Sequence, residues 1–535
     1  MKYLLGKNEM SVKKIQRPEL FFTLVAPVGV DLDMIIEVLS TELKRQNYDS
    51  SLIKITSIMQ DVPSKEKIVP DPYLESIMSR IKYADDICEQ LERQDALAAI
   101  AIGAVQSERE RLNKERAFIE SRNLQGDELQ EPISGHAYMI RQFKRPGETL
   151  LMRQVYGKLF FQISAYSSPN DRESILRKKI RESHYGTLEE TEARCQAIQL
   201  MAVDYSESDK DFGQEIRGTF PLGDVFVDGV NRKNCEEMLR RFVNLIFGDN
   251  SITPDHDEYG MFLAKSASLR SGDLSRQVGA AIFRSSGEVI SLGCNEVPKY
   301  GGGTYWCGDH PDGRDFAIGG DPNERIKREI LYQLIEILFD RKGLAEELLK
   351  LGTAKEVMTA LMREPSGVKE SKLMDLLEFG RVIHAEMSAI SDAARLGVPV
   401  KGATLYSTTF PCHICAKHIV AAGIERVVFL EPYPKSYAKE LHADSIEIEG
   451  SEEERKVKFV PFMGISPFRY RDFFEKGKRK DDSGNTIRWK EGVGNPIVVI
   501  YREVYIHLET LVIRELRHDL HELEAKRIAA TSVPS

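Results

Sequence analysis

The chain has 535 residues, a length that corresponds to two to four domains, each long enough to bury its own core. Its composition, with 42% hydrophobic and 29% charged residues, is typical of a globular protein and argues against a disordered or fibrous one. The formal net charge of -9 at pH 7 argues against a protein that coats nucleic acid, because that role favours clustered Lys and Arg.

The cysteines are sparse and odd in number. Seven occur in the chain, whereas a secreted disulfide framework is usually denser and even-numbered. The sequence therefore predicts a reducing, cytoplasmic location, in which a close cysteine pair points to a metal. The first 20 residues lack the apolar region and the cleavage site of a signal peptide. The sequence contains no run of 18 apolar residues, so we expect no membrane span.

The first predicted domain covers residues 1–250 and alternates strands with helices. Residues 20–28 form an apolar run that is typical of a buried strand, and 31–46 follow with their apolar side chains on one helical face. A second strand comes next, and then two helical stretches near 71–93 and 95–120. This alternation predicts a parallel α/β sheet. A polar, turn-rich stretch ends the domain.

The second predicted domain covers residues 251–470 and is also α/β. A helix and two strands come first, then charged helices over about 323–380, and then helices and strands in alternation. The charged tail, 471–535, is interpreted as an extension of this domain. It carries a predicted strand at 495–502 and an amphipathic helix at 503–528.

Two short motifs in the second domain have the spacing of a metal site. The letters H-A-E stand at 384–386 and P-C-H-I-C at 411–415. Two thiolates three residues apart at a helix start, Cys412 and Cys415, can face one metal, and His384 can supply a third ligand. Three protein ligands leave a fourth tetrahedral position for water, as a catalytic Zn²⁺ requires. Either motif alone is often an exposed polar pair or a structural or redox site, but their combination favours catalysis.

This combination resembles the H-x-E…P-C-x-x-C pattern of zinc-dependent deaminases. Residues 260–435 resemble the deoxycytidylate deaminase family of the cytidine deaminase superfamily. The supporting stretches are R-S-G-D at 270–273, G-C-N-E-V-P at 293–298, H-A-E-M-S-A-I at 384–390 and S-T-T-F-P-C-H-I-C at 407–415. The resemblance implies a cytidine-deaminase-like α/β/α domain with a central mixed sheet.

The resemblance also implies roles for particular residues. Glu386 need not bind the metal, so it can take a proton from a water whose pKa zinc lowers from about 16 towards about 7. Asn295 is expected to hydrogen-bond the deoxyribose and the base, and the segment from Arg270 and Ser271 to hold phosphate. Ala385 is expected to line the substrate site.

Cys307 and His310 form a second motif of metal-binding residue types. A Cys-x-x-His pair can contribute to a structural zinc, and some members of the family have one. Two further ligands are not obvious in the sequence. We therefore favour the interpretation of a loop cysteine and a solvent-facing histidine.

The junction after the first strand has the position of a phosphate-binding loop but not its chemistry. Such a loop reads G-x-x-x-x-G-K-[ST]. Gly29 can match the second glycine, but Val30 replaces the Lys and Asp31 replaces the Ser or Thr. The region resembles P-loop nucleotide kinases in the order of its elements. We interpret it as a degenerate P-loop kinase-like α/β domain that senses, scaffolds or oligomerises, or is purely structural, and we expect no phosphoryl transfer.

The whole arrangement resembles the bacterial anti-phage dCTP deaminases. That resemblance implies deamination of dCTP and dCMP, depletion of the cytosine deoxynucleotide pool during infection, and a homo-oligomer, either a hexamer or a dimer. It leaves open a regulatory nucleotide or an inhibitory partner such as RNA. The alternatives are a housekeeping dCMP deaminase that supplies thymidylate precursors, a binding module with an inert zinc site, and an editor of polynucleotides.

Overall fold

The computed structural model describes residues 14–531 apart from 206–209, 364–366, 369–370, 432–435, 449–454, 493 and 499. The chain forms two compact units. We call residues 1–258 together with 462–535 the host unit, and residues 259–461 the inserted unit. Within the described part of the chain, none of the helices has the length and apolar character needed to span a membrane.

The host unit is built on a six-stranded sheet in the order β12-β5-β4-β1-β3-β2. The strands are β1 (Leu20–Val25), β2 (Asp49–Lys54), β3 (His136–Arg141), β4 (Phe160–Tyr166), β5 (Val225–Asp228) and β12 (Gly464–Ile465). All neighbouring pairs are parallel except β12 with β5. The central strand β1 is buried along its whole length, as expected of a parallel strand covered on both faces. The predicted parallel α/β sheet is therefore confirmed.

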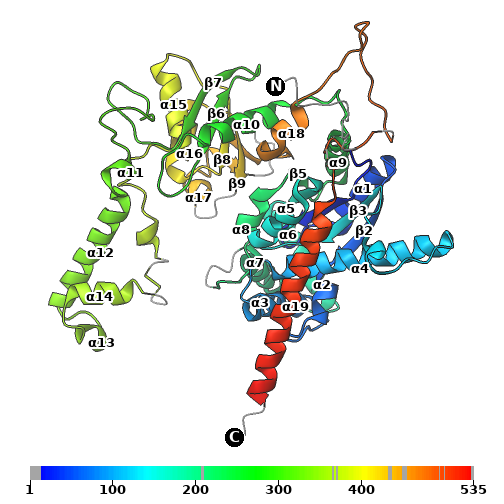
Figure 1. The fold of residues 1–535 in the computed structure, drawn as a ribbon. Helices are drawn as coiled ribbons and strands as arrows, with labels where there is room; N and C mark the ends of the chain where they lie inside the picture. The colour runs from blue at the N-terminus through cyan, green and yellow to red at the C-terminus, as the bar shows by residue number, and fades with distance from the viewer. Residues whose placement is uncertain are drawn as a thin grey trace, which may run out of the picture. The chain divides into compact units, whose positions relative to one another are not determined.

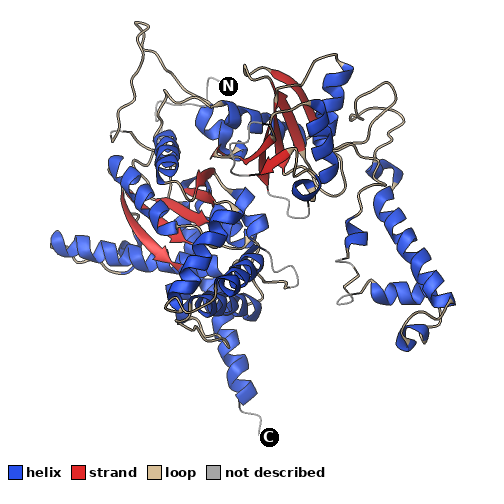
Figure 2. Cartoon of the chain, turned by 180° about the vertical axis from the view of Figure 1, so that it is seen from behind, coloured by secondary structure: helices blue, strands red, loops and turns tan. Residues whose placement is uncertain are grey.

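Helices cover both faces of this sheet (Figure 2). On one face Phe161 of β4 packs edge-on against Phe242 of α9. On the other face Phe21 of β1 stacks on Tyr156 of α5 and meets Tyr505 of α19. The helices of the host unit are α1 (Leu32–Arg45), α2 (Ile55–Ile58), α3 (Tyr73–Gln90), α4 (Ala96–Ile119), α5 (Pro146–Tyr156), α6 (Pro169–Ser183), α7 (Glu190–Tyr205), α8 (Ile216–Thr219), α9 (Arg232–Ile246), α18 (Tyr470–Phe474) and α19 (Val504–Thr531).

A fully buried ion cluster joins the C-terminal helix α19 to the rest of the host unit. Arg109 of α4 donates to Glu19 at 2.9–3.2 Å and to Glu509 of α19 at 2.7–2.9 Å. The hydroxyls of Tyr138 and Tyr505 also donate to Glu19, both at 3.0 Å. All three charged side chains are inaccessible to solvent. Every polar atom of the Glu19 carboxylate is thus satisfied, which a buried charge requires.

The tail differs from the expected division of the chain. Residues 462–535 belong to the host unit, whereas 471–535 were interpreted as an extension of the second domain. The physical reason is the burial of α19 against α4 and the addition of β12 to the host sheet. The predicted helix at 503–528 is confirmed by α19, but the described residues of 495–502 contain no strand. In this segment the N–H of Ile497 donates to the carbonyl of Ile246, and the carbonyl of Ile500 accepts from the N–H of Ile15.

The inserted unit has a mixed sheet, as predicted, and its strands lie in the order β10-β11-β9-β8-β6-β7. The strand β6 is antiparallel to both of its neighbours, and the remaining pairs are parallel. The strands are β6 (Gly279–Phe283), β7 (Val289–Cys294), β8 (Thr404–Thr409), β9 (Arg426–Glu431), β10 (Ile446–Ile448) and β11 (Val457–Pro461). The helices on its faces are α10 (His256–Ser268), α15 (Ala385–Arg395), α16 (His413–Ala422) and α17 (Ala438–Leu441).

Charged helices between β7 and α15 extend away from this sheet (Figure 1). They are α11 (Asp315–Ile318), α12 (Pro322–Asp340), α13 (Glu346–Leu349) and α14 (Ala354–Leu361), so the helices predicted over 323–380 are confirmed as far as Leu361. Leu331 and Ile335 of α12 pack against Ala354 and Val357 of α14 in a small core of their own.

Candidate active site

The first turns of two helices carry the predicted metal ligands. His384 is the residue that caps the N-terminus of α15, and Cys412 caps α16, where its sulfur accepts a hydrogen bond from the backbone N–H of Cys415 at 3.5 Å. A helix N-terminus carries partial positive charge, which favours thiolates there. The predicted placement of both motifs at helix starts is confirmed.

The position of α15 depends on a glycine in the neighbouring strand. A methyl group added at Gly293 of β7 would overlap the carbonyl oxygen of Ala385 and lie 2.6 Å from the backbone nitrogen of Ala389. Both of those residues are completely buried in the core of the inserted unit. The absent side chain at Gly293 therefore allows α15 to lie directly on the sheet, and this contact sets the depth of His384 and Glu386.

The variant Gly293→Ala is expected to fold with a displaced α15 and a damaged site. Overpacking of this kind typically costs about 1–3 kcal/mol of stability, and a shift of about 1 Å in a catalytic group can cost on the order of a hundredfold in rate. Activity and thermal stability, measured together, test this. Gly320→Ala is the matched control, because nothing lies within 4 Å of a methyl group placed there. Equal activity in both variants would contradict the argument.

The three candidate ligands converge on one point. His384 Nδ1 lies 3.3 Å from Cys412 Sγ and 3.4 Å from Cys415 Sγ, and all three atoms lie within 4.8 Å of one another. A tetrahedral zinc with its usual bond lengths separates such nitrogen and sulfur atoms by about 3.5 Å. The residues present therefore fit Zn²⁺. Among the described residues this is the sole group of three or more such side chains, so Cys307 and His310 belong to no comparable cluster.

The electrostatics of the cluster favour one thiolate beside one imidazolium. Hydrogen bonding from Cys415, together with His384, lowers the pKa of Cys412 to about 4. The hydrogen bond with Cys412 in turn raises the pKa of His384 to about 9, and the hydrogen bond with Cys412, followed by burial, raises the pKa of Cys415. Metal binding displaces protons from such ligands. The protons held by His384 and Cys415 are the ones a metal would release.

Glu386 lies next to the ligands but is not one of them. It is 4% exposed, and its Oε1 accepts a hydrogen bond from the hydroxyl of Ser407 at 3.4 Å. Its Oε2 lies 3.4 Å from Cys415 Sγ. Burial, followed by the charge on Cys412, raises the pKa of the Glu386 carboxyl. The geometry places a proton-exchanging group at the edge of the metal cluster, where the sequence predicts one.

The predicted sugar and phosphate residues form one hydrogen-bonded loop. Ser271 donates to the backbone oxygen of Asn295 at 2.7 Å. The side chain of Asn295 accepts from the Val278 N–H at 2.7 Å and donates to the Arg276 carbonyl at 2.8 Å. The structure thus brings Ser271 and Asn295 together and uses the polar atoms of Asn295 to hold the loop that leads into β6.

The side chain of Arg270 contacts the loop at residues 304–306. Its guanidinium lies 3.6 Å above the ring of Trp306 and donates to the carbonyl of Tyr305 at 3.1 Å and to Thr304. Ala385, the first residue of α15, is fully buried against Gly293.

Two buried polar residues near this loop were not predicted. Ser407 hydrogen-bonds Glu386, as described above, and Glu296 accepts from the backbone N–H groups of Gly272 at 2.9 Å and Val297 at 2.8 Å. Ser407 directly precedes the T-T-F-P-C letters and lies in β8, a strand that is buried along most of its length. Glu296 follows Asn295 directly after β7, and a charged residue at this point of the G-C-N-E-V-P stretch was the available signal.

The predicted degenerate phosphate loop lies in the host unit, between β1 and α1. Asp31 caps α1, and its carboxylate accepts from the N–H groups of Asp33 and Met34, both at 3.2 Å. Gly29 has φ +96° and lies against Arg172, while Val30 is 8% exposed. The amides that a phosphate would use at this helix start are therefore satisfied by the chain itself.

Comparisons with known proteins place the inserted unit in a family. Residues 254–431 match the family model described as "Cytidine and deoxycytidylate deaminase zinc-binding region". The deoxycytidylate deaminase of Enterobacteria phage T4 is 50% identical over 174 residues, which cover 32% of this chain and 77% of that protein. The corresponding enzyme of phage T2 is 32% identical over 174 residues, 32% of this chain and 79% of that protein.

The human deoxycytidylate deaminase is more distant, at 26% identity over 173 residues, which cover 32% of this chain and 63% of that protein. The similarity lies in the part of the chain that carries the His384, Cys412 and Cys415 cluster. Because the phage enzymes are matched over more than three quarters of their length, and the cluster fits the metal, the chain belongs to the deoxycytidylate deaminase family, and its cofactor is Zn²⁺.

Proposed function

We propose that the inserted unit deaminates the free deoxynucleotides dCMP and dCTP to dUMP and dUTP, with release of ammonia. The observation that carries the proposal is the convergence of His384, Cys412 and Cys415 with the buried carboxyl of Glu386 beside them. A metal that is only structural needs no such proton carrier. The relatives described as deoxycytidylate deaminases support dCMP as one substrate.

In the proposed mechanism His384, Cys412 and Cys415 hold the metal. Bound Zn²⁺ would supply a water molecule of lowered pKa for attack on C4 of the cytosine. Glu386 would accept the two protons of the attacking water in turn, delivering the first to the ring nitrogen and the second to the departing amine. Ser407 fixes the carboxylate through its hydrogen bond to Oε1. The C4–N bond breaks as a C4–O bond forms.

We assign the sugar and phosphate to the loop formed by Arg270, Ser271 and Asn295, next to Ala385. The hydrogen bonds of Asn295 to the backbone of Arg276 and Val278 give this loop a fixed shape. A closed sugar pocket disfavours a ribose, because a buried 2′-hydroxyl without a partner costs about 1–3 kcal/mol. The acidic net charge of the chain disfavours a polynucleotide, which requires a cationic groove.

The test is a product assay on the purified chain with dCTP, dCMP, CTP, cytidine and a cytosine-containing single-stranded oligonucleotide. Deamination of dCTP and dCMP is expected to exceed that of CTP. An oligonucleotide turned over as fast as dCTP would overturn the proposal of a free-nucleotide substrate. Equal rates on CTP and dCTP would contradict the closed sugar pocket alone.

We further propose that the activity serves anti-phage defence in the cytoplasm by depleting dCTP and dCMP, and that the chain forms a homo-oligomer. The two-part architecture supports this proposal, because it resembles that of the anti-phage dCTP deaminases. The match to the phage T4 enzyme covers 32% of this chain, so a deaminase of that size does not require the host unit. Phage plating on cells that carry the chain or its Glu386→Gln variant tests it. Equal plating would favour the housekeeping alternative.

Cys415→Ala is expected to lose the metal that the wild-type chain binds at one Zn²⁺ per chain. Cys415 is completely buried, and metal-binding free energy is partly folding free energy, so the inserted unit should also lose stability. Elemental analysis of the purified variant measures the zinc content. Cys235→Ala is the control, because Cys235 is equally buried but lies in α9 of the host unit. Full occupancy in Cys415→Ala would refute the ligand assignment.

A further inference from the structure

A cavity opens at the carboxyl edge of the host sheet, where β1, β2 and β3 end. Its volume is about 400 Å³, which is within the range of small-molecule sites. The loop at 27–30, helix α3 and the residues that follow β3 line it. Strand β1 lies between β3 and β4, so the chain crosses over β1 to continue the sheet. Open parallel sheets bind ligands at the carboxyl ends of their strands near such a reversal.

The lining of the cavity is strongly basic. Only one carboxylate, that of Asp204, is among the lining residues. The basic lining residues are Lys54, Arg80, Arg141, Lys144, Arg145 and Lys179. An excess of positive charge in a concave site attracts anions.

Three of these cations already have carboxylate partners. Lys144 pairs with Asp204 at 2.5 Å, Arg141 pairs with Asp33, and Arg145 pairs with Asp85 and Glu148. The other three, namely Lys54, Arg80 and Lys179, form no ion pair with any carboxylate in the described part of the chain. The cavity thus holds three cationic side chains without an internal counter-charge.

The aromatic ring of Tyr73 lies near two of these cations. Lys179 Nζ lies 5.9 Å from the centre of the ring. Burial raises the pKa of Tyr73, and the nearby charge of Arg80 lowers it. Lys54 lies directly opposite Arg141 in the parallel register of β2 and β3 and lines the same cavity. The cavity therefore combines an aromatic ring with cations that have no carboxylate partner among the described residues.

One carboxylate of the chain lies in the cavity, beside the loop after β1. Asp204 of α7 accepts a hydrogen bond from the backbone N–H of Val28 at 2.6 Å and from Lys144 Nζ. Asp31 caps α1 and accepts from the N–H groups of Asp33 and Met34, so a phosphate cannot use these two amides. The carboxylate of Asp204 repels an anion at the loop, so the cations without carboxylate partners in the described chain are the groups that favour anion binding.

The rest of the lining is apolar. Met59, Ile77, Ile81, Ala84 and Leu97 line the cavity together with Tyr73. Side chains of this kind bind a flat apolar group, and an aromatic ring can stack on it. The ligand chemistry that matches both parts of the lining is a phosphate group joined to a planar ring system.

We propose that this cavity binds a small molecule that carries one phosphate and a planar ring, with Lys54, Arg80 and Lys179 holding the phosphate. The ligand is bound without phosphoryl transfer, because the loop after β1 lacks the Lys and the hydroxyl that such transfer uses. The site belongs to the host unit and is independent of the zinc cluster.

The experiment measures binding to the full-length chain by calorimetry. The probes are AMP, GMP and dTMP, each beside its own nucleoside, together with inorganic phosphate and ribose 5-phosphate. At least one monophosphate is expected to bind in the micromolar range, at least tenfold more tightly than its nucleoside and than either phosphate without a ring. Charge-assisted hydrogen bonds from Lys or Arg to a phosphate contribute on the order of tenfold or more in affinity.

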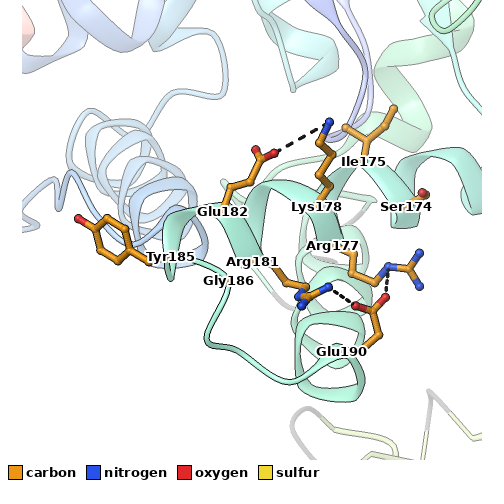
Figure 3. A pocket seen from close by; sticks show the side chains of 9 residues that line it. All are labelled: Ser174, Ile175, Arg177, Lys178, Arg181, Glu182, Tyr185, Gly186 and Glu190. Carbon is orange, nitrogen blue, oxygen red and sulfur yellow. Dashed lines mark hydrogen bonds and ion pairs between the residues drawn. The ribbon is translucent and has the colours of Figure 1, made fainter.

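Two variants locate the binding in the cavity. Arg80→Gln and Lys179→Gln are each expected to raise Kd on the order of 10- to 100-fold. Lys178→Gln is the matched control, because this neighbouring lysine lines a separate surface hollow and pairs with Glu182 at 3.9 Å (Figure 3). Unchanged thermal stability shows that the variants fold.

Three results would overturn the proposal. They are a failure of all three monophosphates to bind, a nucleoside that binds as tightly as its monophosphate, and wild-type affinity in both Arg80→Gln and Lys179→Gln. The last result would assign any observed binding to another part of the chain. Conversion of a monophosphate to a diphosphate in the presence of ATP would refute the claim of binding without transfer.

Discussion

Replacement of Glu386 by Gln is expected to abolish deamination while leaving the zinc in place. The side chains have nearly the same shape, but Gln cannot accept and return a proton. General acid–base groups contribute about a hundred- to ten-thousandfold to a rate, and here one residue is assigned every proton transfer. The loss should therefore lie at the upper end of that range. Product formation and zinc content, measured on the same preparation, test this.

The controls for this variant come from the same unit. Asp392→Asn makes the same chemical change in α15, where Asp392 pairs with Arg395 and not with the metal cluster, so activity should not change. Ser407→Ala removes the hydrogen bond to Glu386 Oε1 but keeps the carboxylate, so its loss should be much smaller. Substantial turnover by a zinc-replete Glu386→Gln protein would remove Glu386 from the mechanism.

Arg109→Met is expected to be the most destabilising single change in the host unit. It leaves the carboxylates of Glu19 and Glu509 buried side by side with no cation between them. Breaking a buried ion pair in this way typically costs about 3–5 kcal/mol, which for a unit of this size lowers Tm on the order of 10 °C. Thermal unfolding followed by circular dichroism measures the shift, and proteolysis of α19 should accelerate.

A neighbouring arginine provides the comparison. Arg111 is 52% exposed in the same helix and pairs with Glu108 at 2.7 Å and with Glu115, so Arg111→Met should cost about 1 kcal/mol or less. Adding Glu19→Gln and Glu509→Gln to Arg109→Met should restore part of the lost stability, because the unpaired charges are gone. If Arg109→Met is no more destabilising than Arg111→Met, the cluster does not hold α19.

The metal cluster could be predicted because its residues lie in two short stretches of the sequence. Cys412 and Cys415 lie within one helical turn, and His384 and Glu386 within another, so two short motifs carry most of the geometry. The strand β1 was predictable for the same reason, since its six residues form one apolar run. In both cases residues that are close in the sequence determine what is close in space.

The place of the tail could not be predicted, because it depends on contacts between distant residues. Arg109 and Glu509 are 400 positions apart, and in the sequence each is a charge in a charged helix, which argues for exposure. The roles of Asn295 and Arg270 were equally hidden. Their residue types suit a ligand, but hydrogen bonds to Val278 and Tyr305 become visible only in three dimensions.

The insertion of one unit within the other has a consequence for synthesis on the ribosome. Residues 259–461 leave the ribosome as a continuous segment, so the zinc cluster can form while the last strand and the last helix of the host unit do not yet exist. During that interval the buried cluster of Glu19 and Arg109 lacks the carboxylate of Glu509, and the host sheet lacks β12. A premature stop at codon 504 would therefore remove α19 but leave the residues of the metal site in place, and the buried side chains that lose their partner, Glu19 and Arg109, lie in the first part of the chain.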